Sequence, residues 1–404
     1  MTALLPGMCQ PFPVPGIRLG VAQAGIKRQG RDDLLVIETQ AGASCAALFT
    51  RNAFCAAPVI VAREHLASAP RWLVVNSGNA NAGTGERGLA DARQTCECLA
   101  GLAGGDARQV LPFSTGVIGE YLPLDRLERA LPEALASLDE EGWERAARAI
   151  MTTDTRVKMA SRRIPVAGDT LTVTGIAKGA GMIHPDMATM LAFLGSDARI
   201  DAADLQSLLA RCVDRTFNCI TVDGDTSTND ACVLLASGMS PAPRLVPGTA
   251  EFAGFEQAVF EVCAELAEAI VRDGEGATKL IRIRVEQAAD GGEARTVAKT
   301  IAHSPLVKTA FFASDPNWGR ILAAIGRAGC QHLDINRVSI WLGSVQIVDQ
   351  GSRAAGYTEA SGAAVMAQDD ILVRVVLGRG SATETVLTCD FSYDYVRINA
   401  EYRT

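Results

Sequence analysis

The residues with the clearest chemical potential lie in one stretch, 178–193, with the sequence KGAGMIHPDMATMLAF. Thr189 follows Ala188 and directly precedes an apolar run. Cleavage of the Ala188–Thr189 bond by an N→O acyl shift would give Thr189 a free α-amine beside its hydroxyl. Because an α-amine titrates near about 7.7–8.0, it can accept the hydroxyl proton at neutral pH. The alternative is that Thr189 is a β-branched residue that only opens a strand.

Three further positions carry groups that could act on a substrate. A threonine hydroxyl beside a glycine amide, as at Thr115 and Gly116, can supply the two donors that a tetrahedral oxyanion needs, although an ordinary turn would explain the pair as well. Lys178 suits a substrate carboxylate as a point charge, unless it is only a solvated lysine. Glu275 lies between two glycines and can approach a cationic amino group closely, or it is a simple loop carboxylate.

The polar loop 223–230 has oxygen-bearing side chains at alternate positions, as the start of a calcium loop does. Its sixth position is Thr228 rather than glycine and the distal glutamate is missing, so Asx turns are favoured over a metal site. The four histidines do not stand at metal-ligand spacing from one another, and the chain has no Walker A, G-x-S-x-G or H-E-x-x-H motif. We therefore expect neither a metal nor a cofactor.

Four stretches together resemble the ornithine acetyltransferase (glutamate N-acetyltransferase) family. They are 178–193, TGVIG at 115–119, TVDGDTSTND at 221–230 and DPNWGR at 315–320. The resemblance runs in order over nearly the whole chain, and the motifs are highly specific when they are taken together. We expect the last of them to be architectural, with a proline turn, a tryptophan that packs and an arginine that pairs.

The resemblance implies transfer of an acetyl group from N2-acetyl-L-ornithine to L-glutamate, in the cyclic arginine pathway and with ping-pong kinetics. Thr189 would be the nucleophile and its α-amine the base, with Thr115 and Gly116 as the oxyanion hole and Ala188–Thr189 as the cleaved bond. The substrate-binding residues that it implies are Thr152, Lys178, Thr189, Glu275, Asn399 and Thr404. Some members of that family also accept acetyl-CoA as a donor and so make N-acetylglutamate, although no CoA-binding loop stands out in this sequence.

Periodicity predicts the elements that must position these residues. Residues 1 to about 30 should be irregular because of Pro11, Pro13 and Pro15. The predicted strands are 34–39, 46–49, 72–76, 111–119, 171–175, 190–194, 231–236, 280–285 and 385–395. The predicted helices are 88–102, 124–151 with a kink or break at Pro132, one capped by Asp201, and 252–272.

Composition narrows the class of protein. The chain has 404 residues, 48 % of them hydrophobic, and a net charge of −8 without a basic run, so a nucleic-acid partner is not expected. Its apolar runs are shorter than the about 18–20 residues of a membrane span, and its first residues lead us to expect no secretory signal. Eleven cysteines without a C-x-x-C pair indicate reduced thiols, and hence a cytoplasmic protein.

By resemblance, the fold is a layered α/β sandwich of the N-terminal-nucleophile type with a smaller C-terminal α/β domain. Cleavage would give an α chain, 1–188, and a β chain, 189–404, which assemble as α2β2. Residues 189–280 would complete the main sandwich, and about 281–404 would form the smaller domain.

Two other functions stay open from the residues alone. One is a self-processed N-terminal-nucleophile amidase or aminopeptidase that passes the acyl group to water. It would consume acetylornithine without glutamate, whereas the transferase would not. The other is a non-enzymatic α/β protein that binds a small molecule and never cleaves, which requires Thr189 to remain internal.

Overall fold

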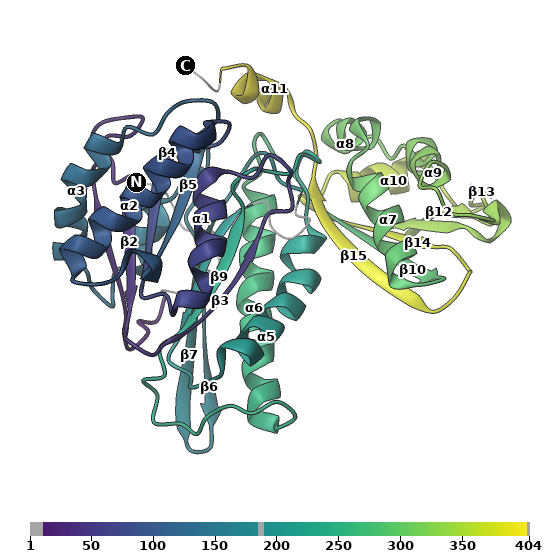
Figure 1. Cartoon of the computed structure of the whole chain (residues 1–404). Helices are drawn as coiled ribbons and strands as arrows, with labels where there is room; N and C mark the ends of the chain where they lie inside the picture. Colours follow the sequence, from purple (N-terminus) through teal and green to yellow (C-terminus); the bar gives the residue numbers. More distant parts are fainter. Residues whose placement is uncertain (1–10, 185–189, 402–404) are drawn as a thin grey trace. The chain divides into compact units, whose positions relative to one another are not determined.

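The computed structural model describes residues 11–184 and 190–401 (Figure 1). These residues form two compact units. Unit 1 contains residues 11–179, 184, 190–218 and 226–270, and unit 2 contains 180–183, 219–225 and 271–401. The predicted division at Ala188–Thr189 follows the covalent chain rather than these units and stays a prediction.

One of the two sheets of unit 1 has the strand order β1-β2-β4-β5. Its strands are β1 (Ile17–Ala22), β2 (Leu34–Thr39), β4 (Trp72–Asn79) and β5 (Val110–Val117). The pairs β1–β2 and β2–β4 are antiparallel, whereas β4 and β5 run parallel. The parallel pair matters for function because its register places Gly78 opposite Gly116, at the carboxyl ends of both strands.

The other sheet of unit 1 has the order β3-β9-β8-β7-β6. Its strands are β3 (Ser44–Phe49), β6 (Lys158–Val166), β7 (Asp169–Lys178), β8 (Leu191–Ser196) and β9 (Ala231–Ala236). All pairs are antiparallel except β8–β9. Strands that are buried on both faces read as nearly continuous apolar runs, as in the ACVLLA of β9.

The two sheets of unit 1 pack face to face over a shared apolar core. Phe113 of β5 and Phe193 of β8 meet there edge to face, with ring centroids 5.3 Å apart. The helices α2 (Gly85–Ala103) and α3 (Leu124–Ala136) cover the outer face of the first sheet, and α5 (Ala202–Arg215) and α6 (Ala250–Arg272) cover that of the second (Figure 1). The layered α/β sandwich is therefore confirmed.

Shorter helices complete unit 1. They are α1 (Ala57–His65), α4 (Trp143–Ala149), and the 3-10 turns Leu66–Ser68, Ala107–Gln109 and, partly, Phe217–Cys219. The indole of Trp143 is fully buried and enters the core between the sheets.

Unit 2 is a smaller α/β body with one sheet of order β13-β12-β11-β14-β10-β15. Its strands are β10 (Leu280–Ala288), β11 (Ser339–Leu342), β12 (Val345–Asp349), β13 (Ser352–Arg353), β14 (Asp370–Val376) and β15 (Ala382–Cys389). Its helices are α7 (Gly291–Ala302), α8 (Pro305–Phe312), α9 (Trp318–Gly326), α10 (Glu359–Met366), α11 (Tyr393–Ala400) and the 3-10 turn Ile335–Arg337. The apolar sides of the sheet and of helices α7 to α10 share one core.

Some local predictions were wrong, each for a physical reason. The strand β1 lies within the segment expected to be irregular, because the prolines end at Pro15 and the apolar IRLGVA follows. The predicted helix 124–151 is two helices, α3 and α4, and the break lies after Ala136 rather than at Pro132, because the buried Leu131 and Ala134 hold the last turn of α3.

Two further expectations failed near helix starts. The strand β15 ends at Cys389, and Ser392 then caps α11, so the predicted strand through 395 is partly a helix. Asp201 stands at the start of α5, but its carboxylate pairs with Arg244 and does not cap the helix. Among the helices that the structure describes, none is long and apolar enough to cross a membrane.

Candidate active site

The side chain of Lys178 contacts two other predicted site residues of unit 1. Lys178 ends β7 and is buried, and its Nζ donates to the hydroxyl of Thr152 over 2.7 Å and to that of Thr115 over 3.2 Å. An ammonium group can only donate, so both hydroxyl oxygens act as acceptors and each O–H remains able to donate elsewhere. The structure therefore brings Thr115, Thr152 and Lys178 together, and the roles that the resemblance implies for them stay predictions.

A buried carboxylate beneath this group was missed by the sequence analysis. Asp154 accepts from Lys158 Nζ at 2.7 Å, from the Gly179 amide at 2.7 Å and from the Thr152 amide at 2.9 Å. The Lys178 Nζ lies 4.0 Å from the Oδ2 of Asp154. The side chains of Asp154 and Lys158 are both 0 % exposed. Asp154 thus fixes the backbone on both sides of the site.

Burial acts to raise the pKa of Asp154, but the charges of Lys158 and Lys178 and the hydrogen bonds outweigh it and hold that pKa well below its usual range. The group is therefore a permanent anion that compensates two lysines. The signal that could have found it is the spacing of Asp154 and Lys158, four residues apart in a segment with few other charges.

Gly116 occupies a position that only glycine fits. Its φ is +137°, and a Cβ there would lie 2.2 Å from the carbonyl carbon of Gly78 on the neighbouring strand. The adjacent backbone is also braced, because the Asn229 side chain donates to the carbonyl of Ser114 at 2.9 Å and to that of Ala80 at 2.6 Å. The Thr115–Gly116 peptide is consequently rigid, as a preorganised oxyanion hole requires.

Asp230 is a second buried carboxylate that sequence reasoning treated only as the end of a loop. It is 3 % exposed, and its Oδ2 has no hydrogen-bond partner among the described residues. Burial raises the pKa of Asp230 well above its usual value. Hydrogen bonds from Ser227 and the charge of Lys178 offset this rise only in part. The next residue, Ala231, donates its amide to the carbonyl of Met190 at 3.0 Å, so Asp230 lies beside the start of β8.

Glu275 and Asn399, two other predicted substrate contacts, meet within unit 2. The Asn399 Nδ2 donates to Glu275 Oε2 at 2.8 Å, and the Glu275 amide donates to the carbonyl of Ala180 at 2.8 Å. A Cβ on Gly181 would lie 2.5 Å from the same carboxylate, so the glycine is needed for this approach. A carboxylate that is 6 % exposed and held in this way can bind an amino group.

The loop predicted to contain Asx turns binds the chain that precedes residue 184. Asp223 accepts from the amides of Met182 at 2.6 Å and Ile183 at 2.9 Å, and from that of Asp225 at 3.2 Å, which is the expected Asx turn. The carbonyl of Ile183 accepts from the amide of Val222 at 2.7 Å. The described residues contain no group of three or more His, Cys, Asp or Glu side chains arranged for a metal ion.

The remaining predicted residues have simpler outcomes. Ala188, Thr189 and Thr404 lie outside the described residues, so their predicted roles stay predictions. In the architectural motif, Asn317 caps α9 and Trp318 packs against the core of unit 2. Arg320 donates to the carbonyl of Leu306 at 2.7 Å rather than to a carboxylate.

Comparison with known proteins supports the resemblance. The chain is 70 % identical over 392 residues to the arginine biosynthesis bifunctional protein ArgJ of Methylococcus capsulatus, covering 97 % of this chain and 96 % of that protein. It is 55 % identical over 393 residues to the protein of the same name from Pseudomonas fluorescens, covering 97 % of each.

A crystal structure of arginine biosynthesis bifunctional protein argJ from Bacillus halodurans is 45 % identical and superposes with a TM-score of 0.51. It covers 52 % of this chain and 99 % of that one. The model of the ArgJ family matches residues 18–404. The chain therefore belongs to the ArgJ family.

Proposed function

We propose that this chain is an acetyltransferase of arginine biosynthesis, which moves the acetyl group of N2-acetyl-L-ornithine to L-glutamate. The observation that carries the proposal is the contact of the Lys178 ammonium with the hydroxyls of Thr115 and Thr152, above the buried anion Asp154. In a chain of the ArgJ family, this is the arrangement expected beside the nucleophile of an acyl transfer.

In the proposed reaction, the hydroxyl of Thr189 attacks the acetamide carbonyl while its α-amine takes the hydroxyl proton. The Thr115 hydroxyl and the Gly116 amide stabilise the oxyanion. The C–N bond then breaks, ornithine leaves with that proton, and an acetyl ester remains on Thr189. The amine of glutamate attacks this ester, and the threonine hydroxyl is restored. Because the Thr115 oxygen accepts a hydrogen bond from Lys178, the hydroxyl proton of Thr115 is directed to the oxyanion.

The substrates are amino acids, and each cluster offers a charge that suits one of their groups. Lys178 would bind a substrate carboxylate, and the Glu275–Asn399 pair would bind a cationic amino group. Acetyl-CoA would be a second acetyl donor for glutamate, as the family's bifunctional name suggests. We further propose that the two chains assemble as α2β2 in the cytoplasm.

The first experiment is intact-mass analysis of the purified protein beside Thr189→Ala. The wild type should give chains of 188 and 216 residues from the 404-residue precursor, and the variant should remain uncut. A folded wild type that is never cut would refute the proposed nucleophile and favour the small-molecule-binding alternative.

Kinetics then separate transfer from hydrolysis. Initial rates with N-acetylornithine and glutamate should give the parallel double-reciprocal lines of a ping-pong mechanism. Consumption of N-acetylornithine at an equal rate without glutamate would instead identify an amidase.

Thr115→Val tests the oxyanion hole directly. The substitution keeps the shape of the side chain but removes the donor, and loss of one such donor typically lowers kcat about 10²–10³-fold. Thr300→Val is a matched control, because Thr300 is a half-buried helix residue of unit 2 that donates only to the carbonyl of Thr296 at 2.7 Å in the described contacts. A Thr115→Val enzyme as active as this control would remove Thr115 from the mechanism.

A further inference from the structure

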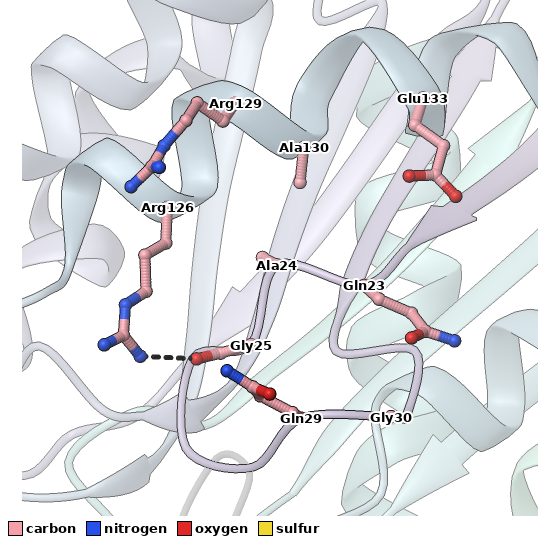
Figure 2. Close-up of a pocket in the computed structure, with 9 residues that line it drawn as sticks. All are labelled: Gln23, Ala24, Gly25, Gln29, Gly30, Arg126, Arg129, Ala130 and Glu133. Carbon is pink, nitrogen blue, oxygen red and sulfur yellow. Dashed lines mark hydrogen bonds between the residues drawn. The ribbon is translucent and has the colours of Figure 1, made fainter.

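A hollow of about 530 Å³ lies on unit 1 between the helix α3 and the loop that follows β1 (Figure 2). From the helix it is lined by Arg126, Arg129, Ala130 and Glu133, and from the loop by Gln23, Ala24, Gly25, Gln29 and Gly30. None of these residues belongs to the site described above.

The rim of the hollow is rich in exposed cations. Lys27 and Arg28 directly precede the lining residues Gln29 and Gly30 and are exposed, as are Arg126 and Arg129. Of the acidic side chains nearby, Glu133 lines the far end and Asp125 forms an exposed ion pair with Arg129. Such a pair contributes little to stability, so an anionic ligand can displace it. Two others are already engaged, because Asp32 pairs with Arg145 and Asp33 accepts from amides of the loop. In a chain with a net charge of −8, this is a locally basic surface.

The loop is shaped in advance by a buried carboxylate. Asp33, which is 2 % exposed, accepts from the amides of Ala24 at 2.7 Å, Gly25 at 3.2 Å and Ile26 at 2.6 Å. Arg126 then ties the loop to the helix, because its Nη1 donates to the carbonyl of Gly25 at 2.7 Å (Figure 2). The loop therefore does not have to be ordered when a ligand binds, which reduces the entropic cost of binding.

The same loop reaches the proposed oxyanion hole. A Cβ on Gly78 would lie 3.0 Å from the Lys27 Cβ and 3.1 Å from a methyl of Ile26, so the loop packs directly on Gly78. Gly78 is in turn the partner of Gly116 in the parallel register. The basic loop is thus separated from Gly116 by one strand backbone only.

The far end of the loop is connected to the site as well. Arg31 donates through its Nη2 to the carbonyl of Met151, the residue before Thr152. The loop that lines the hollow therefore contacts, through Lys27 and Arg31, residues next to the proposed acyl-transfer residues.

From this geometry we propose that the hollow binds the phosphate-bearing nucleotide end of an acyl-CoA donor, with Lys27, Arg28, Arg126 and Arg129 as its cationic contacts. The inference rests on the proposed function, because it needs the acyl group to be delivered to Thr189. The thioester C–S bond breaks as the ester C–O bond forms, and the leaving thiolate takes the proton held by the α-amine. N-acetylornithine has no phosphate and would not use the hollow.

Two double variants test the proposal, Arg126→Gln with Arg129→Gln, and Lys27→Gln with Arg28→Gln. The second double variant keeps the hydrogen bond from Arg126 to Gly25, so a loss of activity in it cannot be due to the loss of that bond. The matched control is Arg108→Gln, since Arg108 is equally exposed and paired with an aspartate but lies before β5, at the end opposite to Gly116.

Each enzyme is assayed with glutamate and three acetyl donors: acetyl-CoA, S-acetylpantetheine, which carries the same thioester without the nucleotide, and N-acetylornithine. We expect both double variants to lose at least tenfold in kcat/KM for acetyl-CoA and to change less than twofold with the other two donors. Adenosine 3′,5′-diphosphate should compete with acetyl-CoA in the wild type and at least tenfold more weakly in the variants. Added salt should lower kcat/KM for acetyl-CoA more than kcat/KM for the other two donors.

Unchanged use of acetyl-CoA by both double variants would overturn the proposal, and so would a parallel loss with all three donors. A wild type that uses N-acetylornithine but not acetyl-CoA would also overturn it, together with the proposed second donor, while leaving the proposed transfer from N-acetylornithine to glutamate intact. Failure of the wild type with every donor would instead refute the proposed function itself.

Discussion

Asp154→Asn should destabilise the protein strongly, because it removes the negative charge that compensates Lys158. The side chains of Asp154 and Lys158 are 0 % exposed and 2.7 Å apart, and breaking such a buried pair from one side costs about 3–5 kcal/mol. That is a large part of a typical unfolding free energy of about 5–15 kcal/mol. The amides of Thr152 and Gly179 would also face an asparagine that cannot satisfy all of the donors.

The assay is urea unfolding at pH 7 in a Thr189→Ala background, so that a single chain unfolds. The pKa of Asp154 is depressed in the folded state, so its contribution is complete above the ordinary aspartate pKa of about 3.9 and is lost only as the pH falls through the depressed value. Measurement at pH 7 therefore captures the whole effect. Glu64→Gln, at an exposed pair with Arg93, is the control and should cost less than about 1 kcal/mol.

A compensating variant separates stability from activity. Asp154→Leu combined with Lys158→Met removes both charges and should recover most of the stability, because a buried ion pair replaced by apolar side chains is often neutral. In the cleavable background this variant should still be inactive, since Thr152 and Gly179 have lost their acceptor. A loss below about 1 kcal/mol for Asp154→Asn, or an active double variant, would refute the reasoning.

Three more substitutions have defined outcomes. Gly116→Ala should abolish acetyl transfer, because its Cβ would lie 2.2 Å from the backbone of Gly78; rates of the soluble variant measure this. Asn399→Leu removes the 2.8 Å donor of Glu275 and should raise the KM of both amino-acid substrates about tenfold with little change in kcat, as steady-state kinetics would reveal. Burial lowers the pKa of Lys308, so the unfolding free energy of the wild type should rise as the pH approaches the ordinary lysine pKa of about 10.4. Between pH 7 and 10, the unfolding free energy of Lys308→Met should therefore rise less steeply with pH than that of the wild type.

Local pattern predicted much of the framework correctly. The apolar run at 72–76 is indeed the strand β4, and the helical spacing at 88–102 lies within α2. Both segments have a strong hydrophobic period and polar residues at their ends. Tertiary contacts therefore change only their lengths. The segment at Ile17–Ala22 was missed because the prolines before it mask a strand that pairing with β2 stabilises.

The contacts of the site were not accessible in the same way. Thr115 and Lys178 are 63 residues apart and meet because their strands lie in facing sheets, which no periodicity reveals. Asp154 and Asp230 act through burial, and the sequence gives no measure of burial for a single aspartate in a polar segment. Family resemblance named the contact residues, whereas only coordinates could add the carboxylates beneath them.

The order of strands in the second sheet has a consequence for the durability of the processed enzyme. The strands β3, β6 and β7 precede the proposed cut and β8 and β9 follow it, yet β9 pairs with β3 and β8 with β7. Once cut, the two chains cannot part without opening this sheet, and refolding would require two molecules to meet at low concentration. The mature enzyme would therefore persist because it unfolds slowly, and heat inactivation would be irreversible even where the uncut precursor refolds.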